Sequence, residues 1–184
     1  MCTGFFVASV LASTLVWCGF VWLYQQTFDW SEWLPRINIV YFPHGLRMIL
    51  VILFNSAGAV GIALGTAVMG ADLIRAKPAL GLTQSAVAGL AVWLAVRLVL
   101  KPSSGPNTGA QTTAGISVLN VKSLVTLAFA SAVLNASGHC LAWYLFDPEA
   151  SQLETRFATI FTGDLFGALL LLYALRTVLL FLER

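Results

Sequence analysis

The chain has 184 residues, of which 59% are hydrophobic and only 10% are charged. A soluble globular domain carries about 25% charged residues, so a surface this poor in charge needs lipid as its main solvent. The formal net charge of +2 is too small, and the basic residues are too scattered, to indicate a nucleic-acid partner.

Apolar stretches separated by short polar connections predict an all-α integral membrane protein, a single domain over residues 1–184 with a bundle of about six transmembrane helices. About 20 apolar residues in a helix cross a hydrocarbon core of about 30 Å. We expect the first stretch to be an uncleaved span, because it lacks a basic amino-terminal region and a clear cleavage site before Gln25. The expected spans cover residues 4–24, 37–53, 59–74, 82–100, 117–146 and 156–182.

The second expected span is broken near its start by Pro43-His44-Gly45. Proline removes a helix donor, and such a break at membrane depth is tolerated only inside protein or beside water. His44 and Arg47 are three residues apart and share a helix face if the helix resumes at the proline. Arg47 then either extends to the bilayer surface or faces the bundle interior and pairs with Asp164.

The third span is predicted to follow a tight turn over residues 55–58. Ala57, Gly61 and Gly65 recur at intervals of four, which allows close contact with another helix. Residues 101–115 are rich in proline and glycine and predict a flexible loop before the fifth span.

Polar residues lie inside the last two spans. Asn135 and His139 are four residues apart and face one way. Asp164 stands about a third of the way along the last span, where a charge costs about 2.5–3.5 kcal/mol on insertion scales and needs a partner, a proton or water. We therefore expect a polar centre of His44, Arg47, Asn135, His139 and Asp164. It could be a structural ion pair, a ligand-binding site or a proton relay.

Other chemistry has little support in the sequence. Cys2, Cys18 and Cys140 lack metal-ligand spacing and are expected to lie in helix interfaces. The two histidines are far apart in the chain and show no paired spacing for a metal. No serine lies in a nucleophile elbow, so we expect no enzyme, no metal and no cofactor.

Two motifs resemble elements of a bacterial family. Tyr41-Phe42-Pro43-His44-Gly45 resembles the Trp-Pro-Pro-x-Gly element of the bacterial membrane-associated sensor domain of the first type. Phe161-Thr162-Gly163-Asp164-Leu165-Phe166-Gly167 resembles the late Trp-x-Gly-Asp-x-x-Gly helix of that domain. The chain departs from the pattern at Phe42 and lacks the tryptophan before Gly-Asp. The matching positions are Pro43, Gly45, Gly163, Asp164 and Gly167.

The resemblance implies a sensory role in signal transduction, because this family's domain precedes diguanylate cyclases, phosphodiesterases and histidine kinases. We expect a stand-alone sensory or interaction subunit that signals or assembles through lateral helix contacts with a membrane or cytosolic protein. With six spans, the connections on the side of the termini carry slightly more Lys and Arg than those on the other side, so we expect both termini in the cytoplasm. The resemblance implies a multi-pass protein of the bacterial inner membrane.

Two alternatives remain open. The chain could be a small-molecule carrier like the substrate-binding subunits of energy-coupling-factor transporters, which also have six spans, with Ala8 and Ala12 as a docking face. It could also be a structural accessory subunit of a membrane complex. A carrier predicts a closed, ligand-sized polar cavity around four residues: His44, Asn135, His139 and Asp164. A structural subunit predicts no cavity and a continuous apolar contact face.

Overall fold

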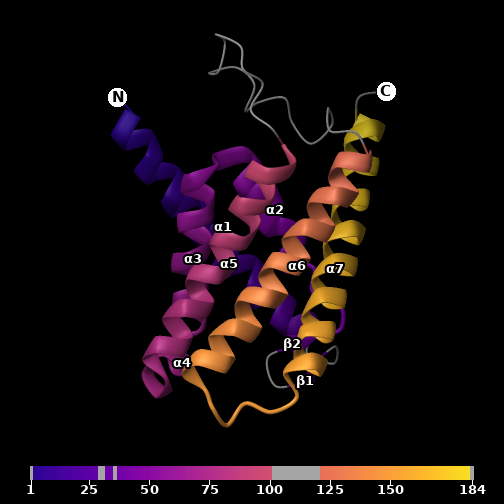
Figure 1. The fold of residues 1–184 in the computed structure, drawn as a ribbon. Helices are drawn as coiled ribbons and strands as arrows, with labels where there is room; N and C mark the ends of the chain where they lie inside the picture. The colour runs from indigo at the N-terminus through magenta and orange to yellow at the C-terminus, as the bar shows by residue number, and fades with distance from the viewer. Residues whose placement is uncertain (1, 29–31, 35–36, 101–120, 183–184) are drawn as a thin grey trace.

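The computed structural model describes residues 2–28, 32–34, 37–100 and 121–182, which are almost entirely helical (Figure 1). The all-α prediction is confirmed for this part of the chain, apart from one short antiparallel hairpin. The elements in chain order are α1 (Cys2–Phe28), β1 (Glu32–Leu34), β2 (Ile37–Asn38), α2 (Pro43–Phe54), α3 (Ser56–Met69), α4 (Ala71–Ala76), α5 (Pro78–Val99), α6 (Val121–Phe146) and α7 (Leu153–Leu182).

The long helices run alternately up and down the bundle (Figure 1). The first turn of α1 and the last turn of α7 lie at the same end, which we call the terminal end. The β1–β2 hairpin, α4 and the α6–α7 connection lie at the opposite end, which we call the hairpin end. Along the chain, α6 packs between α5 and α7, and α3 packs between α1 and α5.

Within the described part of the chain, four helices are long and apolar enough to cross a bilayer: Thr3–Phe28, Pro78–Val99, Val121–Phe146 and Leu153–Val178. Large apolar side chains cover their outer faces, as expected where the neighbouring solvent is lipid. Examples are Leu15 at 73% exposed, Leu98 at 68% and Tyr173 at 72%. The chain is therefore a membrane-embedded helical protein.

Helix α2 is shorter than the span expected over residues 37–53. It has 12 residues, or about 18 Å at 1.5 Å per residue, which is less than a bilayer core. Pro43 occupies its first turn, where the missing N–H costs nothing, so the helix begins there. The preceding residues form strand β2 and a non-helical segment over residues 39–42. Seven of the 12 residues are buried, and α2 contacts α1, α3, α5 and α7.

Helix α3 returns from α2 through the predicted tight turn at Asn55. Asn55 has a positive φ of 51°, a conformation that asparagine tolerates better than most residues. Its side-chain Oδ1 accepts a hydrogen bond of 3.1 Å from Trp93 Nε1 of α5, which ties the turn to the bundle.

The predicted stripe of small residues packs α3 against α1. A Cβ added at Gly61 would lie 2.5 Å from Ser13 Cβ, and one added at Gly65 would lie 2.5 Å from Trp17 Cδ1. Thr14 Oγ1 donates a hydrogen bond of 3.1 Å to the Gly61 carbonyl across the same contact. Close packing of the two backbones is therefore the role of the stripe, as the spacing predicts.

Candidate ligand-binding site

The two sequence motifs meet where the non-helical segment over residues 39–42 lies against α7. Gly163 and Gly167 lie one turn apart on α7 and leave room for a neighbouring backbone. A Cβ on Gly163 would collide with the Asn38 carbonyl oxygen, and a Cβ on Gly167 would collide with the Tyr41 carbonyl. The Tyr41 amide donates a hydrogen bond of 2.9 Å to the Gly163 carbonyl. The segment before α2 therefore lies directly on α7, and α7 satisfies one of its backbone donors.

The same close contact continues into α2. A Cβ added at Gly45 would lie 2.9 Å from Leu171 Cβ and 3.2 Å from Ala168 Cα of α7. The motif glycines Gly45, Gly163 and Gly167 thus belong to one contact of α7 with α2 and the segment before it, which we call the α2–α7 contact. Pro43 begins α2, and Asp164 follows Gly163 on α7. Within this contact His44, the residue after Pro43, lies beside Asp164.

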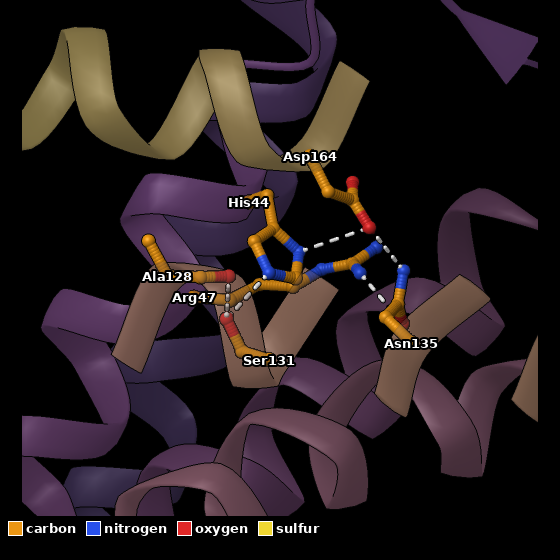
Figure 2. A network of polar contacts seen from close by, with 6 residues as sticks. All are labelled: His44, Arg47, Ala128, Ser131, Asn135 and Asp164. Atoms are coloured by element: carbon orange, nitrogen blue, oxygen red, sulfur yellow. Dashed lines mark hydrogen bonds and ion pairs between the residues drawn. The ribbon is translucent and has the colours of Figure 1, made fainter. Parts of the chain in front are cut away.

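Five buried side chains from α2, α6 and α7 form a polar cluster around Asp164 (Figure 2). His44 Nδ1 lies 3.4 Å from Asp164 Oδ2, and His44 Nε2 lies 3.0 Å from Ser131 Oγ. Asn135 Nδ2 donates a hydrogen bond of 2.7 Å to the same Asp164 oxygen. Arg47 Nη1 donates to Asn135 Oδ1 at 3.3 Å. The cluster joins three helices through side chains alone.

Arg47 faces the bundle interior and is 4% exposed. Its guanidinium carbon lies 4.8 Å from the centroid of the Trp17 ring and 5.4 Å from that of the Tyr41 ring, which is cation–π distance. Arg47 reaches Asp164 through the Asn135 amide, which accepts from the cation with its oxygen and donates to the carboxylate with its nitrogen. The amide thereby holds the two charges apart in one hydrogen-bonded chain.

The order Ser131–His44–Asp164 is that of a hydrolase triad, but the surroundings differ. Ser131 and His44 are both fully buried, and the Ser131 hydroxyl also donates to the Ala128 carbonyl at 3.1 Å. An acyl-transfer nucleophile needs space for a substrate carbonyl beside its oxygen. This geometry supports a bridge between helices.

A cavity of about 680 Å³ extends from the polar cluster toward the hairpin end. Arg47, Asn135, His139 and Asp164 line its inner part. Ligand pockets in proteins have volumes of about 300–1,000 Å³, so this cavity has the size of a binding site. Its wall toward the hairpin end includes residues from the end of α1 and from the hairpin: Tyr24, Gln25, Gln26, Phe28, Glu32 and Ile37.

The structure brings four of the five predicted polar-centre residues into one network and places the fifth on the cavity wall. His139 lies near Trp143, with 6.1 Å between the ring centroids, and forms no hydrogen bond with the described residues. Ser131 was not predicted, although it lies on the same face of α6 as Asn135 and His139, at intervals of four. Within the described residues, no three His, Cys, Asp or Glu side chains are arranged to hold a metal ion.

Sequence reasoning also missed part of the cavity wall. A tryptophan near the end of a membrane span is typical of the bilayer interface, but Trp17 is 1% exposed and stacks on Arg47 inside the bundle. Thr66 and Gln84 line the cavity from α3 and α5, where single polar residues in apolar helices give no distinctive pattern.

Comparison of the chain with known protein families, curated proteins and solved structures finds no match. The candidate site therefore rests on its own geometry: a buried cation and a buried carboxylate, bridged by an amide, at the inner end of a ligand-sized cavity.

Proposed function

We propose that this protein is a membrane-embedded binding subunit that takes up a small polar molecule in the cavity and passes the binding event to a protein partner, as a sensory subunit does. One observation carries the proposal: Arg47, Asn135 and Asp164 are buried in the bundle and also line a cavity of about 680 Å³. Charged residues inside membrane bundles commonly mark ligand or ion pathways.

Unsatisfied polar atoms on the cavity wall support binding over a purely structural role. Four buried atoms have no hydrogen-bond partner among the described residues, and their residues all line the cavity: Trp17 Nε1, Arg47 Nε, Thr66 Oγ1 and Gln84 Nε2. Most buried polar groups in proteins are hydrogen-bonded, so a cluster of exceptions requires an explanation. Water or a ligand in the cavity, with small adjustments of these side chains, would supply the missing partners.

The α2–α7 contact supports a sensory output. A molecule bound beside Arg47 of α2 and Asp164 of α7 would touch both sides of this contact. Helix α7 has 30 residues and continues from the cavity to the terminal end (Figure 1). A change in how α2 lies on α7 would therefore reach a partner at the far end of the bundle. The motifs that resemble the bacterial sensor domain form this same contact, which favours the sensory proposal.

We infer that the chain crosses the membrane six times. Strand β2 and residues 39–42, which bend and turn into α2, lengthen this segment beyond the roughly 18 Å of the helix alone, and we expect residues 37–54 together to cross the bilayer. Non-helical backbone at membrane depth is tolerated where protein covers it, and α7 covers this segment. With both termini in the cytoplasm of a bacterial inner-membrane protein, the cavity would open toward the outer face.

A carrier is the second candidate, and one observation favours it. Ala8 and Ala12 are exposed on the outer face of α1, as a docking face for a transporter partner requires. Binding without transport after reconstitution with the partner would support the sensory subunit. Accumulation of the ligand inside liposomes would support the carrier.

Thiol labelling tests the aqueous cavity on which both candidates depend. The three native cysteines are first replaced by alanine, and His139→Cys is introduced on the cavity wall. The matched control is Leu141→Cys on the same helix, where the native side chain is 56% exposed on the outer face. We expect a charged, membrane-impermeant maleimide to label His139→Cys from one side of the membrane only, and not to label Leu141→Cys. Equal lack of labelling at both positions would contradict the proposal.

A further inference from the structure

We infer that the ligand is a zwitterion of the α-amino-acid type, with its carboxylate on Arg47, its ammonium on Asp164 and a large side chain directed toward the hairpin end. This inference rests on the proposed binding function. It follows from the unused bonding capacity of two opposite charges on one cavity wall.

The first step concerns the hydrogen-bond donors of Arg47 that its contact with Asn135 does not use. Arg47 Nη1 donates a hydrogen bond to Asn135 Oδ1. Among the described residues Arg47 Nε has no hydrogen-bond partner, and a guanidinium carries five N–H donors in all. A guanidinium prefers to bind carboxylates through two parallel N–H groups. Arg47 therefore retains the donors for a carboxylate after it has bound Asn135.

The second step concerns Asp164. Both of its protein contacts, from Asn135 Nδ2 and His44 Nδ1, are made to Oδ2. Among the described residues, Oδ1 accepts no hydrogen bond, although a carboxylate has about four lone-pair sites in all. Asp164 lines the cavity, so the carboxylate can accept N–H donors of a bound ammonium group.

The third step excludes ligands that carry one charge. A simple anion at Arg47 would also lie near the Asp164 carboxylate, which repels it. A simple cation at Asp164 would lie near a guanidinium that two aromatic rings and Asn135 hold in place. Inside a bundle these like-charge interactions are weakly screened and are costly. A molecule with both charges a few bonds apart meets a complementary group at each.

The fourth step concerns the rest of the cavity. Beyond the polar end, the wall combines apolar and aromatic side chains with polar ones. The apolar and aromatic part includes Val21, Tyr24, Phe28 and Ile37, and the polar part includes Gln25, Gln26, Glu32 and Asn38. The volume of about 680 Å³ leaves room for a large side chain beside these groups. The class of ligand is therefore an α-amino acid with a large side chain.

A binding series on the purified full-length protein in mild detergent tests the inference. Thermal unfolding is measured with each of the natural α-amino acids, and the member that stabilises most is compared with its amide and with its N-acetyl derivative. The amide lacks the anion and the N-acetyl form lacks the cation. We expect an amino acid with a large side chain to raise Tm, as any ligand of the native state does. Each derivative should bind at least about tenfold more weakly, because it lacks one charge-assisted interaction.

Variants assign each charge to its residue. In Asp164→Asn the preference for the amino acid over its N-acetyl derivative should disappear, and in Arg47→Gln the preference over its amide should disappear. Asp72→Asn, an exposed acid at 84% side-chain exposure, should keep both preferences. If either cluster variant fails to fold, the derivative series on the unaltered protein decides the question.

The outcomes separate this inference from the proposed function. If either derivative binds as tightly as the amino acid, or if no amino acid binds while His139→Cys is labelled, the zwitterion assignment is wrong and the binding cavity stands. If no amino acid binds and His139→Cys is also unreactive, both conclusions fail.

Discussion

Substitution of Gly167 by alanine tests whether the α2–α7 contact organises the site. A Cβ at this position would collide with the carbonyl carbon and oxygen of Tyr41 and would lie 2.7 Å from the Phe42 nitrogen. All three are main-chain atoms of the segment that leads into α2. They cannot move aside as the end of a flexible side chain can, so the whole segment must shift.

The expected cost follows from three terms. Restoring ordinary van der Waals contact requires a shift on the order of 1 Å, and overpacking of this kind costs about 1–3 kcal/mol. The shift also weakens the 2.9 Å hydrogen bond from the Tyr41 amide to Gly163, at about 1 kcal/mol. The higher helix propensity of alanine compared with glycine offsets about 1 kcal/mol of this loss. We therefore expect a net loss of about 2 kcal/mol in the free energy of unfolding.

Thermal or denaturant unfolding followed by tryptophan fluorescence in detergent measures this loss. Gly19→Ala on α1 is the matched control, because a Cβ there meets nothing within 4 Å. The control should leave stability unchanged or raise it by up to about 1 kcal/mol through propensity. If Gly167→Ala is as stable as Gly19→Ala, the close packing of the two motifs does not hold α2 in place, and the reasoning is refuted.

Three further substitutions test the polar cluster and the helix turn by the same measurement. Asp164→Asn removes the charge that Asn135 and His44 contact, and it should lower the free energy of unfolding by about 1–3 kcal/mol. The control Asp72→Asn, at the exposed Asp72–Arg75 pair, should change it by less than about 1 kcal/mol. Similar effects of the two variants would show that Asp164 is not central to the fold. Ser131→Ala removes the hydrogen-bond partner of His44 Nε2 and should lower the free energy of unfolding by about 1–3 kcal/mol. The control Ser137→Ala, at an exposed position on the same helix, should be neutral within about 0.5 kcal/mol. A neutral Ser131→Ala would argue against a stabilising contact between His44 and Ser131. Trp93→Phe removes the indole hydrogen bond to Asn55. It should lower the free energy of unfolding by about 1 kcal/mol more than Trp22→Phe, where the native side chain is 59% exposed. Equal losses would show that this hydrogen bond does not stabilise the turn.

The helices were largely predictable because their signals are local. Apolar runs located the four long membrane helices, and the spacing of Ala57, Gly61 and Gly65 anticipated the α1–α3 contact. The i and i+3 spacing of His44 and Arg47 correctly placed both on one face of a helix, and the structure shows that this face is the inner one. The cost of a deep carboxylate correctly indicated that Asp164 has polar neighbours.

The remaining features depend on contacts between distant segments. Pro43 indicated a break, but the start of α2 and its central position depend on a groove that Gly163 and Gly167 form on α7. The bridging role of Asn135 depends on the distance between two charges on other helices, which no pattern within α6 encodes. The cavity wall combines residues from most of the helices, so single polar residues such as Thr66 and Gln84 became meaningful only after the bundle was assembled.

The groove on α7 has a consequence for biosynthesis. The ribosome makes residues 39–42 long before it makes α7, the helix that later covers them and accepts the Tyr41 amide proton. If this segment lies at hydrocarbon depth, as the six-span proposal holds, the unpaired Tyr41 amide would cost several kcal/mol until α7 arrives. On that proposal, the segment that contains α2 would wait in the translocation machinery or at the water interface, and its final insertion would be a late step of assembly that requires α7.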